Sequence, residues 1–276
     1  MTRILVTGAT GFVGRTLCPL LITAGHEVLA ASRNPQAAKD MDGVEPRLAP
    51  DLGPDAEWRP ALAGVDAVVH LASRVHVIQE RSADPLGAYR RVNAEGTRRL
   101  AEEAAAAGVR RLVFLSTIKV NGESSGGTPF REDHTPAPRD AYGQTKWEAE
   151  QALFEVAAGS AMEAVVLRPP LVYGGGVKGN FLSLLKLCMR APPLPLGGID
   201  NRRSMIYAGN LADAVSRCLA SPGAAGQIFL VGDGEDVSTP QLVGRIAAAL
   251  GRPARLFWAP PGLLRLAGAA IGKSAS

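Results

Sequence analysis

The chain has 276 residues, of which 46% are hydrophobic and 20% charged, and its formal net charge is +4. This length accommodates one full α/β domain with a smaller lobe, and the hydrophobic share excludes an intrinsically disordered protein. Because lysine and arginine are spread along the chain, a nucleic-acid-binding patch is not predicted. A basic pocket for a small anion remains open.

Three scattered cysteines, Cys18, Cys188 and Cys218, argue against a disulfide framework. We expect each to be a small core residue of a cytoplasmic protein. The histidines and cysteines show no spacing typical of a metal site. The first apolar run ends at once in a glycine turn, and no run approaches the roughly 20 apolar residues that span a bilayer. The sequence therefore predicts neither a signal peptide nor a membrane segment.

Short apolar runs alternate with helical stretches through the first half of the chain. The predicted strands are 4–7, 27–32, 67–71, 112–116 and 164–167, and the predicted helices are 14–23, 89–107 and 142–157. Strand–helix alternation with β-branched strands predicts an α/β fold, a doubly wound parallel sheet of the Rossmann type.

Prolines and glycines punctuate the chain after Arg168, which predicts a loop-rich, smaller C-terminal lobe that binds substrate. We expect a dinucleotide-binding domain over 1–168, with 205–225 returning to it, and the lobe over 169–204 and 226–276. Further elements are predicted as a helix over 210–220, a strand over 227–231, a helix over 239–250 capped by Ser238 or Thr239, and a docking helix over 260–272.

A glycine loop follows the first predicted strand and opens the first predicted helix. In this position Gly8 permits a tight turn, Gly11 lets the backbone approach a pyrophosphate, and Gly14 allows close helix packing. The helix N-terminus then attracts the phosphates. The residues expected to contact the cofactor here are Gly8, Thr10, Gly11, Phe12, Val13 and Gly14. The alternative is a glycine-rich turn with a structural role only.

The second predicted strand ends in Ser32 and Arg33, without the acidic residue that usually holds the ribose of NAD. A guanidinium can make two charge-assisted bonds to a 2′-phosphate, so NADP(H) is favoured. NAD(H) stays open, with Arg33 merely exposed. Asp51 and Leu52, between the predicted strands 27–32 and 67–71, are expected beside the adenine, although Asp51 could equally cap a helix.

Tyr142 and Lys146 lie one helical turn apart on the same predicted helix face. A free phenol has a pKa near 10, and a neighbouring ammonium, together with an oxidised nicotinamide, favours the phenolate. The preceding strand ends in Ser116 and Thr117. We expect all of these side chains at the carboxyl edge of the sheet, where such folds bind ligands.

These motifs together resemble the extended short-chain dehydrogenase/reductases that act on nucleotide sugars. The resemblance rests on the glycine loop, Asp51-Leu52, His70-Leu71-Ala72, Asn93 with Gly96-Thr97, Ser116-Thr117, Tyr142 with Lys146, Arg168-Pro169 with Tyr173-Gly174, and Arg203 before 210–214. It implies a catalytic triad of Thr117, which orients the substrate oxygen, Tyr142, which moves the proton, and Lys146, which anchors the nicotinamide ribose and tunes the phenol.

The same resemblance implies further contacts. Leu71, Ala72 and Asn93 would lie beside the cofactor, with His70 as a structural neighbour. Asn180 and Arg203 would lie near the diphosphate of the substrate. The family also implies a homodimer formed through the helices over 89–107 and 142–157.

The residues after Thr117 narrow the reaction. Sugar 4,6-dehydratases of this family carry an Asp-Glu pair there and 3,5-epimerase/reductases a cysteine, whereas this chain has Ile118 and Lys119. The stretch 191–204 resembles the bacterial polysaccharide branch. We therefore expect reduction of a UDP-4-keto-6-deoxy-hexosamine, with a UDP-hexose 4-epimerase holding NAD tightly as the alternative. A non-catalytic NADP sensor is disfavoured because Tyr142 and Lys146 are both present. Relatives usually run on with a further piece of the substrate lobe, so whether the C-terminus is truncated stays open.

Overall fold

The computed structural model describes residues 1–75 and 83–260, which form two compact units. The first unit comprises Met1–Pro170 and Ala208–Val231, and the second comprises Leu171–Tyr207 and the residues from Gly232 onward. The docking helix expected over 260–272 falls, beyond Pro260, outside the described residues.

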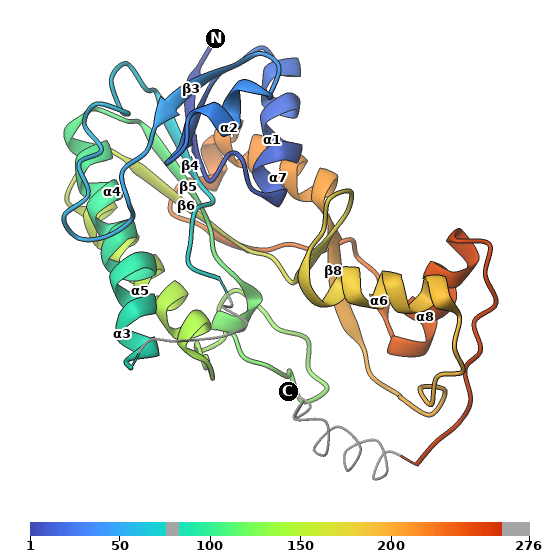
Figure 1. Ribbon diagram of the computed structural model, residues 1–276. Helices are drawn as coiled ribbons and strands as arrows, with labels where there is room; N and C mark the ends of the chain where they lie inside the picture. The colour runs from blue at the N-terminus through green and yellow to red at the C-terminus, as the bar shows by residue number, and fades with distance from the viewer. Residues whose placement is uncertain (76–82, 261–276) are drawn as a thin grey trace. The chain divides into compact units, whose positions relative to one another are not determined.

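The first unit is built on a seven-stranded sheet in the order β3-β2-β1-β4-β5-β6-β9, with every pairing parallel. Its strands are β1 (Arg3–Thr7), β2 (Glu27–Ser32), β3 (Val44–Leu48), β4 (Ala67–His70), β5 (Arg111–Leu115), β6 (Glu163–Arg168) and β9 (Ile228–Leu230). In Figure 1, helices α1 and α7 lie together on one side of this sheet, and α4 and α5 on the other. The predicted doubly wound α/β fold is confirmed.

The helices of this unit are α1 (Phe12–Thr23), α2 (Gln36–Lys39), α3 (Pro85–Arg90), α4 (Gly96–Ala106), α5 (Ala141–Ala158) and α7 (Ala208–Ala220). The single helix predicted over 89–107 is interrupted by a π-helical turn, η1 (Arg91–Glu95). Such turns insert an extra residue and frequently occur at functional sites. Here the turn carries Asn93.

The strand order reverses between β1 and β4, since β2 and β3 lie beyond β1 while β5 and β6 lie beyond β4. Their apolar residues are buried against the two helical layers, with Leu5, Val68 and Phe114 in one continuous core. A parallel sheet binds ligands at such a switch point, outside the carboxyl ends of its strands. This places the candidate site at the ends of β1, β4 and β5.

Two elements of the sheet differ from expectation. β3 was not among the predicted strands because Pro46 interrupts its pattern, yet it forms the edge of the sheet, where a missing N–H is tolerated. The strand predicted over 227–231 was assigned to the smaller lobe. That assignment is wrong for β9, which pairs in parallel with β6 and completes the other edge of the larger sheet.

The second unit holds a three-stranded sheet in the order β10-β8-β7. Its elements are β7 (Leu171–Tyr173), α6 (Gly179–Arg190), β8 (Arg203–Tyr207), β10 (Asp236–Val237) and α8 (Thr239–Ala249). Phe181 and Ile246 belong to its own small core. The expected cap is Ser238, whose hydroxyl accepts from the amide of Gln241 in a capping box.

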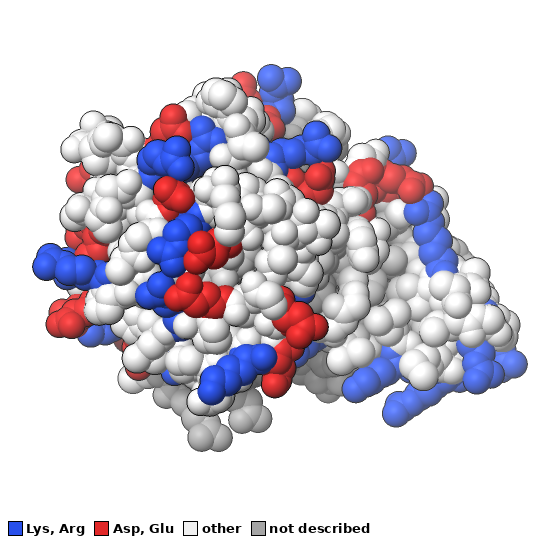
Figure 2. Space-filling view, turned by 90° about the horizontal axis from the view of Figure 1, so that it is seen from above, with Lys and Arg blue, Asp and Glu red and all other residues white. Residues whose placement is uncertain are grey.

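Figure 2 shows basic and acidic side chains interspersed over one face of the molecule. The three cysteines are free and buried within α1, α6 and α7, as expected. Within the described part of the chain, none of the helices is long and apolar enough to cross a membrane.

Candidate active site

The glycine loop joins β1 to α1. Gly8 has a φ of +68°, and a Cβ on it would lie 2.9 Å from the backbone nitrogen of Ala72, just after β4. A Cβ on Gly14 would collide with the backbone of Ala9. Gly11 precedes the first turn of α1, which has no side-chain cap, while Thr10, Phe12 and Val13 stay partly exposed. The N-terminus of α1 has no side-chain cap, and Gly8, Gly11 and Gly14 place no side chains around it. This arrangement fits a dinucleotide diphosphate.

The end of β2 lies beside the segment that follows β3. The guanidinium of Arg33 pairs with the carboxylate of Asp51 at 3.3 Å, and both side chains are largely exposed. The Ser32 hydroxyl accepts from the amide of Asn34, and Leu52 packs on the core. Asp51 precedes a bend and a turn rather than a helix, so the helix-cap alternative is wrong. The structure thus brings Arg33 and Asp51 together.

His70 at the end of β4 belongs to a buried chain of hydrogen bonds. Thr97 Oγ1 donates to the carbonyl of Asn93 at 2.6 Å, and therefore accepts from Nε2–H of His70 at 3.1 Å. The other ring nitrogen, Nδ1, then accepts from Thr7 Oγ1 at 2.6 Å. Burial, with the nearby charge of Lys146, lowers the pKa of His70 to about 3. His70 is thus a neutral structural residue, as expected.

Asn93 joins the segment after β4 to helix α5. Its Oδ1 accepts from the amide of Arg74 at 2.8 Å, and its Nδ2 donates to the Arg74 carbonyl and to Thr145 Oγ1. Only 2% of Asn93 is exposed. Its amide therefore acts by holding the backbone that continues from Leu71 and Ala72.

Tyr142 lies in the first turn of α5, whose N-terminus is capped by the Asp140 carboxylate. Burial raises the pKa of Tyr142 to about 12, a hydrogen bond with Ser73 acts in the opposite direction, and Asp140 and Tyr89 raise it further. Lys146, which was expected to lower the pKa of Tyr142, is not among the groups that shift it.

Lys146 is turned inward, which explains that difference. Its Nζ donates to the Leu115 carbonyl at 2.6 Å and lies 3.8 Å from the centre of the Phe114 ring. Only 1% of the residue is exposed, and burial lowers its pKa to about 7, against the opposing effect of Glu150. The ammonium is thus anchored to β5, next to the end of the strand that leads to Thr117.

Thr117 begins the short 3₁₀ helix η2 (Ile118–Val120) in an extended conformation, and its hydroxyl accepts from the amide of Lys119 at 3.3 Å. The ammonium of Lys119 in turn pairs with Asp140 at 2.6 Å. The loop that carries Thr117 is therefore tied to the helix end that carries Tyr142. All three expected triad residues lie in the first unit.

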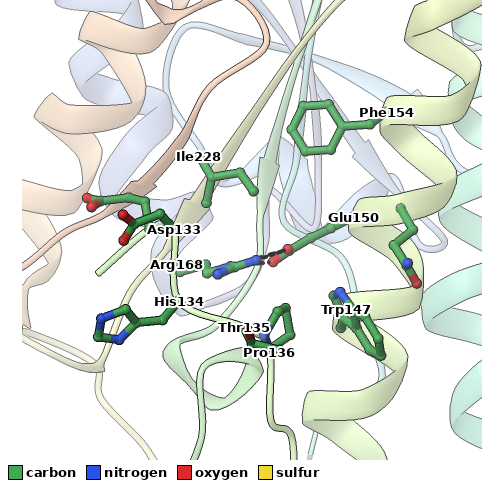
Figure 3. Close-up of a pocket in the computed structure, with 11 residues that line it drawn as sticks. Asp133, His134, Thr135, Pro136, Trp147, Glu150, Phe154, Arg168 and Ile228 are labelled. Carbon is green, nitrogen blue, oxygen red and sulfur yellow. Dashed lines mark hydrogen bonds and ion pairs between the residues drawn. The ribbon is translucent and has the colours of Figure 1, made fainter. Parts of the chain in front are cut away.

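A buried polar network behind these residues was not anticipated from the sequence. The Arg168 guanidinium forms an ion pair with the Glu150 carboxylate, with Nη2 2.6 Å from Oε2. Its Nη1 donates to Asn121 Oδ1 at 3.0 Å. Figure 3 shows this pair among the residues lining a pocket of about 330 Å³, with Trp147 and Phe154 from α5. A signal was available, because a charged residue on an apolar helix face or buried strand needs a partner.

The expected diphosphate contacts lie in the second unit. Asn180 is the second residue of α6, and Arg203 is the first residue of β8, opposite Val237 of β10. Both side chains are exposed. Over residues 1–75 and 83–260, no group of three or more His, Cys, Asp or Glu side chains could hold a metal ion.

Comparison with known proteins shows the family to which the chain belongs. A family model described as "NAD dependent epimerase/dehydratase family" matches residues 4–232. The UDP-glucose 4-epimerase of Vibrio cholerae is 42% identical over 273 residues, covering 98% of this chain and 83% of that protein.

Two solved structures share the fold. MoeE5, solved in complex with UDP-glucose and NAD, is 28% identical with a TM-score of 0.77, over 99% of this chain and 93% of its own. The UDP-N-acetylglucosamine 4-epimerase of Bacillus cereus superposes with a TM-score of 0.79 at 23% identity, over 93% of this chain and 84% of its own. The chain belongs to the NAD-dependent epimerase/dehydratase family of extended short-chain dehydrogenase/reductases.

Proposed function

We propose that this protein is a UDP-hexose 4-epimerase that works with a retained NAD. The observation that carries the proposal is the 42% identity to a UDP-glucose 4-epimerase over nearly all of this chain. The sequence alone favoured reduction of a UDP-4-keto-6-deoxy-hexosamine. The similarity favours the epimerase alternative instead, because the match extends through both structural units.

In this proposal the triad works at C4 of the sugar. The Thr117 hydroxyl hydrogen-bonds the oxygen on C4 of the sugar. Tyr142 accepts the proton of this sugar hydroxyl and returns it after the sugar has rotated to present its other face. A nicotinamide held by the glycine loop would supply the hydride acceptor, and its positive charge in the oxidised form would favour the phenolate. That charge is needed here, because burial holds the pKa of Tyr142 at about 12. Lys146 fixes the ribose edge of the site from its anchor on Leu115.

The remaining expected contacts are proposed for each unit by itself. The loop from Gly8 to Gly14 and the backbone at Leu71 and Ala72 would hold the dinucleotide, and Asn180 and Arg203 the diphosphate of the sugar nucleotide. The close approach of Gly8 to Ala72 supports the proposed dinucleotide contacts. The exposed guanidinium of Arg203 suits the proposed diphosphate contact, since a guanidinium can bind phosphate oxygens.

The proposal is tested by mass spectrometry of nucleotide released from denatured protein, together with turnover of UDP-glucose and UDP-galactose. We expect NAD to be released, and the two sugars to be interconverted without added cofactor, since an epimerase regenerates its cofactor in each cycle. A protein that carries no NAD and instead oxidises NADPH with a UDP-4-keto-6-deoxy-hexosamine would be a reductase. The absence of an acid at the end of β2 is what favours that second candidate.

A prediction about the cofactor follows from Arg33. We expect Arg33→Ala to weaken binding of NADP(H) by roughly tenfold to 150-fold, because a charge-assisted hydrogen bond contributes about 1.5–3 kcal/mol. The affinity for NAD(H) should change little, since the guanidinium is otherwise committed to the exposed Asp51. Calorimetric titration with both cofactors measures this. Equal losses for the two would contradict a 2′-phosphate contact at Arg33.

A further inference from the structure

The buried ion pair between Glu150 and Arg168 lies where three segments of the candidate site meet. Glu150 follows Lys146 by one turn of α5, and Arg168 is the last residue of β6. Their side chains are 2% and 3% exposed. Arg168 Nε also donates to both carboxylate oxygens, at 3.0 and 3.2 Å. The pair is therefore a closed, multiply bonded contact between the helix of the triad and the sheet.

Each partner also holds the segment that carries Thr117. The Ser116 hydroxyl donates to Glu150 Oε1 from one side of Thr117. On the other side, Asn121 accepts from Arg168 and donates to the Arg131 carbonyl at 2.9 Å. The amide of Ile118 donates to the Pro169 carbonyl, next to Arg168, at 2.9 Å. The two residues of one ion pair thus hold the chain on both sides of Thr117.

The energetics of buried charges suggest a role beyond stability. Desolvation can exceed the attraction within a buried ion pair, and apolar residues of similar volume often leave a protein equally stable. What such residues cannot reproduce is the directional bonding to Ser116 and Asn121. We propose that Glu150 and Arg168 are a positioning pair, which holds Thr117 and the Lys146 helix in register for the reaction. Only the kinetic part of this inference rests on the proposed function.

The decisive variant is the double substitution Glu150→Met with Arg168→Met, which removes both charges and the acceptor of Ser116 and leaves neither charge buried alone. A matched control is Glu163→Gln, at the opposite end of β6. Glu163 pairs with Arg111, which keeps hydrogen bonds to the carbonyls of Cys218, Leu219 and Ser221. Both proteins lose an ion pair between β6 and a neighbouring element, but only the first loses anchors of Thr117.

Amide hydrogen exchange provides a readout that needs no substrate. We expect the amides of Ser116 and Ile118, which bond to Leu167 and Pro169, to exchange faster in the double variant. Amides of β4 and α4 should keep wild-type rates, and Glu163→Gln should leave the Ser116 and Ile118 amides unchanged. Wild-type exchange at these two amides in the double variant would overturn the proposal, whatever the reaction of the protein proves to be.

Steady-state kinetics on the reaction established for the wild type provides the second readout. We expect kcat of the double variant to fall on the order of 10²-fold, as for a misplacement of about 1 Å, with KM within about threefold. Should the double variant not fold, Ser116→Ala removes one anchor alone and is expected to lower kcat severalfold. A folded double variant or Ser116→Ala protein with wild-type kcat would overturn the proposal. A wild type without epimerase turnover would instead overturn the proposed function.

Discussion

Substitution of Tyr142 by phenylalanine should lower turnover by roughly 10²–10⁴-fold, the contribution usual for a positioned general acid–base. Its hydroxyl is the proton carrier of the proposed reaction. Removing one oxygen leaves the ring packed at the start of α5 and leaves the glycine loop untouched. Affinity for the cofactor should therefore stay within a few fold. Initial rates and a calorimetric titration on the same preparation measure both quantities.

Tyr173→Phe is the matched control for this prediction. Tyr173 also carries a hydrogen-bonded hydroxyl, which donates to Asp233 at 2.8 Å within the second unit. It lies outside the proposed triad, so kcat should be close to that of the wild type. A Tyr142→Phe protein with near-normal turnover on an established substrate would disprove the assigned proton carrier.

Lys146→Met should abolish most of the activity and yet stabilise the fold at neutral pH. Burial lowers the pKa of Lys146 from 10.5 to about 7, and each pKa unit corresponds to about 1.4 kcal/mol. Between these two pKa values the unfolded chain binds more protons, so this group makes the wild type more stable as the pH rises. The advantage of the methionine variant should therefore be largest at or below pH 7 and shrink towards pH 10.5. Urea unfolding at several pH values tests this.

Lys119→Met, on the loop that carries Thr117, should change the stability at neutral pH in the opposite direction. Burial alone would lower the pKa of Lys119, but hydrogen bonds to Asp140 and Glu123 outweigh it and raise the pKa. That stabilisation is fully present below the ordinary lysine pKa and is lost as the pH rises through the raised value. Its removal should therefore lower the free energy of unfolding at neutral pH. If both substitutions destabilised the protein equally at pH 7, the buried ammonium would not carry the assigned penalty.

The central sheet was predictable because its signals are local. Runs of buried apolar residues in β1, β2, β4, β5 and β6 are separated by recognisable turns. The helix α6 was missed because the glycines and prolines around it outweighed its own amphipathic pattern. β9 was found as a strand but placed in the wrong sheet. A strand of only three apolar residues carries no information about which sheet edge it will join.

The candidate site divides in the same way. The glycine loop and the spacing of Tyr142 and Lys146 are readable from neighbouring positions in the chain. The contacts that decide the electrostatics are not, because Lys146 meets the carbonyl of Leu115 from 31 residues away, and Arg168 meets Glu150 from another element. A pattern shows that a lysine shares a helix face with a tyrosine. It does not show that the ammonium turns toward a strand.

The interleaved order of the two units also bears on how the protein is made. Residues 1–170 supply six strands of the larger sheet, but β9 and α7 arrive only after the first half of the second unit has been synthesised. At about 5–20 residues per second, a nascent chain would expose the unpaired edge of β6 for several seconds. Unpaired strand edges template aggregation. A fragment ending at residue 170 is thus expected to aggregate, whereas one extended to residue 231 can close its sheet.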